Sequence, residues 1–307
     1  MASDTPLRRS LLIAGGDADP NITALLAAAD RDGVSHHKLL VGKSSHPSLT
    51  WNITTGELLL ENQPLECDAA FVRADVFTAL ADGQASSPFR AAAWHTAVMG
   101  WLAAQPGVFI FNRRNFNQLT NKPLVLKLAQ DCGLAIPQTL ITNDVETFLS
   151  NSAGVVKPIN GGGYCEPLAD VLERTPVKEG RVAAPAIVQQ RLVPPELRIY
   201  AIRDRYFAFN VISPELDYRA TQNCRVEPTA VPVELSARFG ALLAKLGLDF
   251  AAADFKSCPD TGQLLFLEVN TGPMFAAFDR ATNGELCRTM LQTLIKGRDR
   301  AARSANE

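Results

Sequence analysis

The sequence predicts an α/β protein whose second half is built from α+β lobes. Short apolar runs of strand length alternate with helical patterns over the first 115 residues, which favours an open α/β sheet. Further along, pairs of apolar runs joined by turn residues predict antiparallel hairpins beside amphipathic helices. A chain of 307 residues is too long for one simple core and long enough for two or three packed lobes.

Composition excludes several classes of protein. Hydrophobic residues make up 47% and charged residues 20% of the chain, as in soluble globular proteins, and no apolar run approaches a membrane span. The net charge of -2 argues against a general nucleic-acid binder, which needs a basic excess. Six scattered cysteines without a Cys-x-x-Cys pair indicate free thiols in the cytoplasm. The four histidines lack metal-ligand spacing.

Alternating strands and helices predict the first lobe. Asp19-Pro20 is typical of a helix start, and the preceding Gly15-Gly16 lacks the spacing of a dinucleotide fingerprint. Arg73 ends a buried strand, where it either reaches a ligand or pairs with Asp75, and we favour the pair. The predicted elements are strands 9–14, 38–41, 68–73 and 108–111, a hairpin of 51–53 with 58–60, and helices 19–30 and 87–104.

The rest of the chain mixes hairpins with helices. We expect a polar loop at Leu172–Ala184 and a stiff, hinge-like connector at Arg191–Pro195. The predicted helices are 118–131, 144–149, 233–246 and 284–296, and the predicted strands are 138–141, 154–158, 186–190, 197–202 and 206–213.

A hairpin at Phe250–Gly272 carries the first candidate site. Two apolar runs flank a turn-rich break, and the second run ends in Glu268-Val269-Asn270. Residues two apart in a strand face the same side, so Glu268 and Asn270 point together. If Asp254 on the paired strand shares that face, two carboxylates and one amide oxygen converge into a donor set that suits Mg²⁺. The alternative is an exposed hairpin face with ordinary polar residues.

A lysine followed by glycines forms the second candidate site. Lys157 ends an apolar strand, and Gly161, Gly162 and Gly163 come next. The ammonium supplies charge and the glycines let backbone amides approach an anion, so the pattern predicts a phosphate site. It differs from a Walker A loop, in which the lysine follows the glycines. The alternative is a flexible hairpin loop with a surface lysine.

Five motifs occur in a fixed order, and together they resemble a known family. They are Asn121-Lys122, Val156-Lys157-Pro158 with its glycines, Val188-Gln189-Gln190 with Glu196-Leu-Arg198, Asp254-Phe255-Lys256 and Glu268-Val-Asn270. Over residues 112–295 this ordered set resembles the ATP-grasp superfamily of carboxylate–amine ligases. The likeness is closest to the microviridin-type (graspetide) peptide cyclases and to the ribosomal-protein glutamylating ligases.

The resemblance implies a three-lobed architecture and a set of ligands. The lobes would be an N-terminal α/β domain (1–115), a central lobe with the glycine-rich loop (116–188) and a C-terminal lobe with the Mg²⁺ site (189–307). ATP would lie between the last two lobes, with one or two Mg²⁺ ions or with Mn²⁺ instead. The implied site residues are Lys122, Lys157, Gly161, Gly162, Gly163, Gln189, Gln190, Leu192 and Glu196 for the nucleotide, and Asp254, Glu268 and Asn270 for the metal.

Two arginines are the candidate catalytic residues. Either Arg198 or Arg219 could clamp the γ-phosphate or an acyl phosphate by bidentate contact. The alternative for each is a structural ion pair, for which Asp217 is an obvious partner of Arg219. The sequence departs from the cyclases at Asp217-Tyr218-Arg219, where they usually carry Asp-Trp-Arg, and at Gln190, where an acidic hinge residue is usual.

The resemblance implies an ATP-dependent ligase that activates a carboxylate as an acyl phosphate and joins it to an amine or hydroxyl. We expect it to modify or cyclise a ribosomally made peptide through acidic side chains. One alternative is addition of an amino acid to a protein or small-molecule carboxylate. Another, of a different class, is a catalytically silent ATP-binding partner protein. We expect a cytoplasmic protein without nucleic-acid or membrane partners, and a homodimer only by analogy.

Overall fold

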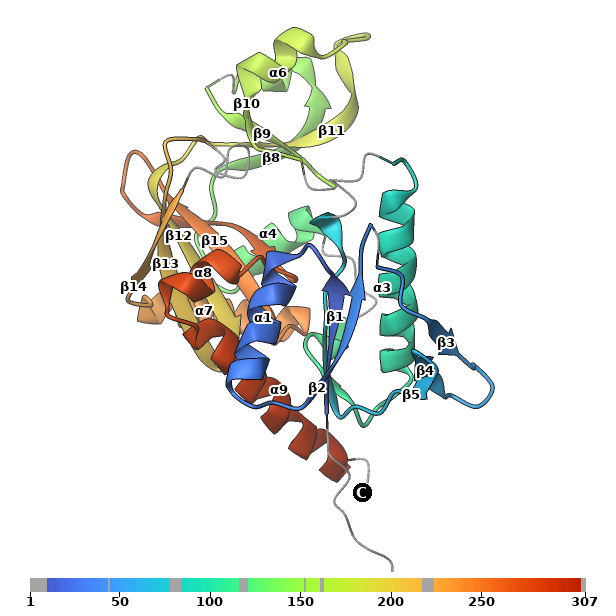
Figure 1. The fold of residues 1–307 in the computed structure, drawn as a ribbon. Coiled ribbons are helices and arrows are strands. Elements are labelled where there is room, and N and C mark those ends of the chain that lie inside the picture. Colours follow the sequence, from blue (N-terminus) through green and yellow to red (C-terminus); the bar gives the residue numbers. More distant parts are fainter. Residues whose placement is uncertain are drawn as a thin grey trace, which may run out of the picture. The chain divides into compact units, whose positions relative to one another are not determined.

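The structure, a computed structural model, divides the chain into two compact units. The first unit combines Met1–Phe116 with Met274–Glu307, and the second is Asn117–Pro273. Figure 1 shows the helices and strands of both units. For residues 298–304 the structure describes the backbone alone. The described stretches are residues 10–43, 45–77, 84–115, 121–151, 153–160, 163–216 and 224–304.

A four-stranded parallel sheet in the order β2-β1-β6-β7 forms the centre of the first unit. Leu12 and Ala14 of β1 share an apolar core with helix α3 (Ser87–Ala103). Helix α1 (Pro20–Arg31) lies on the opposite side of the sheet (Figure 1). The strands are β1 (Leu11–Gly16), β2 (His36–Val41), β6 (Ala69–Val72) and β7 (Phe109–Ile110). The predicted open α/β sheet is therefore confirmed, with strand ends shifted by a few residues.

The predicted hairpin of the first unit is also present. Strand β3 (Leu49–Trp51) pairs antiparallel with β4 (Leu58–Leu60), and β5 (Gln63–Pro64) extends the sheet by one short strand. A short 3-10 helix, η1 (Arg113–Asn115), follows β7.

A buried polar network starts at Asp19, the residue that caps helix α1. One carboxylate oxygen accepts from the Asn21 amide at 2.8 Å, which is the expected N-cap contact. The other accepts from Arg73 Nε at 2.8 Å, and both side chains are buried. Asn21 Oδ1 accepts from the backbone amides of Phe275 and Ala276, at 2.6 and 2.8 Å. The network joins the helix start, the end of β6 and the C-terminal part of the chain.

Removing the Arg73 charge is expected to destabilise the protein. The sequence predicted Asp75 as the ion-pair partner of Arg73, and in the structure Asp19 is a buried partner of Arg73. Arg73→Met leaves the Asp19 carboxylate buried without this counter-charge, a change that costs about 3–5 kcal/mol in comparable pairs. The control Lys38→Ala breaks an exposed pair with Asp30 and should cost under about 1 kcal/mol. Urea denaturation measures both, and equal losses of stability would contradict a special role for the buried pair.

The last two helices pack within the first unit, whereas the sequence predicted residues 189–307 as one domain. Helices α8 (Ala276–Ala281) and α9 (Glu285–Ser304) contact α1, and α9 also contacts β6 and β7. Leu286, Met290 and other apolar side chains of α9 are fully buried there. An amphipathic helix shows in its sequence that one face must be covered, but not which element covers it.

The second unit contains two antiparallel sheets, of which the smaller has the order β10-β9-β11-β8. Its core gathers Phe148, Val156 and Leu168 beside α5 and α6. The predicted loop at Leu172–Ala184 is present only over residues 175–180, because α6 ends at Arg174 and β11 begins at Arg181. The elements are β8 (Thr139–Asp144), α5 (Val145–Leu149), β9 (Val155–Pro158), β10 (Glu166–Pro167), α6 (Leu168–Arg174) and β11 (Arg181–Gln189).

The larger sheet has the order β14-β13-β12-β15-β16. Leu197 and Ile199 of β12 pack in an apolar core with helices α4 and α7. Because side chains alternate along a strand, Glu196 and Arg198 face the opposite side. Helix α7 ends as predicted at Gly247, which adopts a positive φ of 66°. The elements are α4 (Lys122–Asp131), β12 (Val193–Ile202), β13 (Arg205–Ile212), β14 (Arg225–Thr229), α7 (Val233–Leu246), β15 (Phe250–Ser257) and β16 (Leu264–Asn270).

All six cysteines are free thiols, as the sequence predicted. Burial, with a smaller contribution from the nearby Asp68 charge, raises the pKa of Cys67 to about 12, so this thiol stays protonated at neutral pH. Within the stretches described above, no helix combines the length and the apolar character needed to cross a bilayer.

Candidate functional site

The hairpin of β15 and β16 brings the three predicted metal ligands to one face of the larger sheet. Its register pairs Asp254 with Glu268 and Ala252 with Asn270. Directly opposed residues share a face, and so do residues two apart in one strand. The Asn270 Nδ2 donates to Asp254 Oδ2 at 3.1 Å, which leaves the amide oxygen as an acceptor. The convergence predicted from strand alternation is therefore present, while the role of these residues as ligands stays a prediction.

An irregularity in β16 lies beside these ligands. Asp254 pairs with Glu268, but the next residue, Phe255, pairs with Phe266, so Leu267 is an extra residue on that strand. An extra residue of this kind bends the strand and increases its twist, and such bulges are common next to functional sites. Leu267 itself lines the neighbouring cavity.

Arg198 lies one strand further in, directly opposite Asp254. Its guanidinium is 3.4 Å from Asp254 Oδ1, and both side chains are buried. The Arg198 Cζ also lies 5.5 Å from the centre of the Tyr200 ring, in a cation–π contact. The structural ion pair therefore exists, and it places the guanidinium beside the predicted ligand set.

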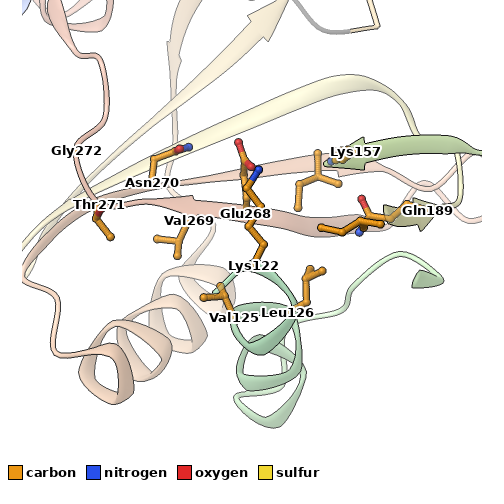
Figure 2. Close-up of a pocket in the computed structure, with 12 residues that line it drawn as sticks. Lys122, Val125, Leu126, Lys157, Gln189, Glu268, Val269, Asn270, Thr271 and Gly272 are labelled. Atoms are coloured by element: carbon orange, nitrogen blue, oxygen red, sulfur yellow. The ribbon is translucent and has the colours of Figure 1, made fainter. Parts of the chain in front are cut away.

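A cavity of about 240 Å³ adjoins the sheet face that carries the predicted metal ligands. Both predicted phosphate-binding lysines line this cavity. Figure 2 shows Lys122 rising from the start of α4 toward β16, with Lys157 and Gln189 further along the cavity. Apolar side chains form much of its wall. The lining residues are Lys122, Val125, Leu126, Lys157, Ile187, Gln189, Leu267, Glu268, Val269, Asn270, Thr271 and Gly272.

The two lysines line the same cavity although their positions are 35 residues apart in the sequence. Asn121 caps α4 by accepting from the Leu124 amide at 3.0 Å, which fixes Lys122 as the first helical residue. Lys122 Nζ donates to the carbonyl oxygen of Pro158 at 3.5 Å, and Pro158 directly follows Lys157. The cavity therefore contains two lysines together with the carboxylate of Glu268.

Of the predicted adenine and ribose residues, Gln189 is the last residue of β11, and the others follow it. Gln190 Nε2 lies 3.7 Å from Cys258 Sγ, in the turn between β15 and β16, and Leu192 is buried. Glu196 lies 3.3 Å from Lys256 Nζ. Hydrogen bonds from the Thr261 side chain and the local backbone lower the pKa of Cys258. Gln190 thus contacts the same hairpin that carries the predicted metal ligands.

Several predicted residues need separate mention. Gly163 is exposed, and a Cβ atom there would lie 2.8 Å from Pro158 Cγ, so a side chain would have to displace this proline. Gly161, Gly162 and Arg219 lie outside the described residues, as does Asp217.

Two residues that contact the candidate site were not among the predicted site residues. Lys256 sits in β15, where every residue is buried, and a lysine in such a strand needs a buried partner. It has two, because its Nζ contacts Glu196 and donates to the Leu216 carbonyl at 3.2 Å. Thr139 accepts a hydrogen bond from Gln189, and this contact had no local signal because 50 residues separate the partners.

The donor set is of the kind that magnesium uses. Within the described part of the chain, no three His, Cys, Asp or Glu side chains form a metal-binding group. Asp254, Glu268 and Asn270 supply two carboxylates and one amide oxygen. Such a set fits an ion that completes its shell with water and phosphate oxygens, as Mg²⁺ does.

Comparison with solved structures establishes the fold: the chain has the fold of ATP-grasp ligases. It is similar to the ATP-grasp ligase PsnB complexed with a minimal precursor, at 22% identity and a TM-score of 0.71, over 93% of this chain and 98% of PsnB. The macrocyclase MdnC from Microcystis aeruginosa MRC, bound with its precursor peptide MdnA, matches at 19% identity and 0.67, over 93% and 99%.

A third solved structure is a RiPP-associated ATP-grasp ligase from Chryseobacterium gregarium, in complex with ADP and a leader and core peptide. It matches at 17% identity and a TM-score of 0.69, over 94% of this chain and 97% of the ligase. No protein-family profile and no curated protein matches the chain. The predicted ATP-grasp architecture is confirmed, since the likeness covers nearly the whole chain.

Proposed function

We propose that the protein is an ATP-dependent ligase that joins a carboxylate to an amine or hydroxyl through an acyl phosphate. One observation carries the proposal. Two lysines and two of the three oxygen-donating residues, from α4, β9 and β16, line a single cavity, and Asp254 and Arg198 lie beside it. Lysines that can bind phosphate oxygens, in one cavity with oxygen donors that can bind a divalent ion, are what a metal-bound triphosphate needs.

In this proposal the cavity binds ATP along its length. Lys122 and Lys157 hold phosphate oxygens, and the apolar walls enclose the base. Gln189, Gln190 and Leu192 line the adenine, with the backbone of the hinge contributing. Glu196 binds the ribose hydroxyls, and its ion pair with Lys256 holds the carboxylate in place.

Asp254, Glu268 and Asn270 would hold the metal. When bound, Mg²⁺ would neutralise charge on the phosphate oxygens during phosphoryl transfer. Arg198 adds a fixed positive charge behind Asp254, since the two side chains are ion-paired and buried. Together with Arg219 it is our candidate for stabilising the γ-phosphoryl group.

The proposed reaction has two steps, phosphoryl transfer and then acyl transfer. A substrate carboxylate oxygen attacks the γ-phosphorus of ATP, the bond to the β-phosphate oxygen breaks, and ADP and an acyl phosphate result. An amine or hydroxyl then attacks the acyl carbon, phosphate leaves, and one proton is released. No side chain of the protein has to form a covalent bond, so the work of the site is positioning and charge neutralisation.

We infer a peptide substrate from the nature of the similar structures. PsnB and MdnC were both solved with precursor peptides, and the likeness to them covers nearly the full chain. The proposed substrate is a ribosomally made peptide with acidic side chains, modified or cyclised in the cytoplasm. The six free thiols agree with this location.

The mass change of a candidate precursor peptide tests the proposal. The full-length protein is incubated with ATP, Mg²⁺ and an acidic, Thr/Lys-rich peptide encoded beside it, and ADP release is followed in parallel. Loss of one water per bond, with one ADP formed each time, is the expected result. A mass gain would indicate residue addition instead. Tight ATP binding without ADP formation, whatever acceptor is offered, would indicate a silent ATP-binding protein and contradict the proposal.

A further inference from the structure

The carboxamide of Gln189 is fixed by a neighbour that the nucleotide assignment does not include. Gln189 ends β11 opposite Thr139 of β8, lines the cavity and is only 3% exposed. Its Nε2 donates to Thr139 Oγ1 at 3.0 Å. The Thr139 hydroxyl in turn donates to the Pro137 carbonyl at 2.8 Å.

This chain of contacts determines which way the amide points. A hydroxyl has one proton to donate, and the Thr139 hydroxyl donates it to the Pro137 carbonyl, because a carbonyl oxygen can only accept. Toward Gln189 the Thr139 oxygen can therefore only accept, so the amide must present its NH₂ group. The reversed amide would place two acceptors together and lose one of the two hydrogen bonds. The Thr139 hydroxyl thus selects one of the two amide orientations.

The selected orientation leaves the amide oxygen of Gln189 as an acceptor in the cavity. Gln189 Oε1 is buried and has no hydrogen-bond partner among the described residues. A buried acceptor without a partner is costly, so a ligand that brings an N–H group to it gains more than one that does not. A ligand that brings another acceptor is repelled.

We propose that Thr139 is a specificity-determining residue that makes the cavity prefer 6-amino purines over 6-oxo purines. The inference rests on the proposed nucleotide function of the cavity and refines it. Adenine carries an exocyclic amine donor at C6, whereas guanine and hypoxanthine carry an acceptor oxygen there. With the amide held by Thr139, only the amine can pair with Gln189 Oε1. Thr139 acts by positioning Gln189 and does not itself contact the base.

Equilibrium binding of ATP and of inosine triphosphate to the full chain tests this inference. The two nucleotides differ at C6, and their ribose and phosphates are identical. The unmodified protein should bind ATP on the order of tenfold to a hundredfold more tightly. Thr139→Val removes the hydroxyl, so the amide can reverse and accept either base. Its preference should fall to within a few-fold, mainly because inosine triphosphate binds more tightly.

Two control variants separate orientation from packing. Thr139→Ser keeps the hydroxyl and should keep the preference for ATP. Thr142→Val removes another hydroxyl of β8, one that accepts from the Asp144 amide, and should also leave the preference unchanged. If Thr139→Val does not fold, the preference of the unmodified protein and Thr139→Ala supply the test.

The outcomes distinguish this inference from the proposed function. Equal binding of both nucleotides by the unmodified protein would overturn the inference but not the nucleotide site. Full preference retained in Thr139→Val would overturn it too. Failure of every triphosphate to bind would instead reject the proposed function on which the inference rests.

Discussion

Replacing Glu268 by alanine is expected to abolish turnover while leaving the fold intact. Glu268 is half-buried on the polar face of β16 and takes no part in the apolar core beneath the sheet. Its carboxylate is one of two that face the predicted metal position, so its loss removes charge that the transferring phosphoryl group requires. We expect the rate of ADP formation to fall at least roughly a hundredfold, as when other preorganised electrostatic groups are removed. Asn270→Ala should behave in the same way.

A matched control makes the result specific. Glu234→Ala removes an exposed glutamate of α7, which lies 3.5 Å from Arg238, and should leave turnover unchanged. Thermal unfolding of all three variants checks that each retains the stability of the parent. Normal ADP formation by Glu268→Ala would remove the metal assignment.

Lys157→Ala is expected to weaken ATP binding strongly. The ammonium lies in the cavity near Lys122, whose Nζ donates to the carbonyl oxygen that follows Lys157 in the chain. A charge-assisted contact to phosphate is worth about 1.5–3 kcal/mol, so the Kd for ATP should rise roughly tenfold to a hundredfold. Isothermal titration of the protein with ATP measures the change.

Two further variants define the cause of this loss. Lys127→Ala removes an exposed lysine of α4 that pairs with Asp131, and should leave ATP affinity unchanged. Lys157→Arg keeps the charge and should retain most of the affinity. Unchanged affinity in Lys157→Ala would count against a phosphate role for this residue.

Strand alternation predicted that the three candidate metal ligands share one face of the sheet, because these residues are close in sequence. Glu268 and Asn270 are two apart in one strand. The turn between the two apolar runs predicts a hairpin, and Asp254 lies in its other strand. Helix α4 was also expected, although its predicted start at residue 118 lies outside the described residues and its cap at Asn121 comes from the structure. Alternation left the register of the two strands open, and it did not predict the bulge at Leu267.

Contacts between distant segments could not be read from the sequence. Two such contacts join strands whose pairing no local pattern specifies. They are the ion pair of Glu196 with Lys256 and the hydrogen bond from Gln189 to Thr139. The same limit explains the final helices, since the apolar face of α9 shows burial but not its partner. The region Leu172–Ala184 was predicted as a loop from its polar residues, yet its two ends belong to α6 and β11, whose polar side chains there are exposed.

The coupling between Mg²⁺ and ATP binding tests the central claim most directly. If Asp254, Glu268 and Asn270 share an ion with the triphosphate, Mg²⁺ must strengthen ATP binding, and ATP must strengthen Mg²⁺ binding by the same factor. Titrations of the unmodified protein and of Glu268→Ala, with and without Mg²⁺, measure this factor. We predict a large factor in the unmodified protein and a factor near one in the variant. An equal Mg²⁺ dependence in both proteins would contradict the proposed site.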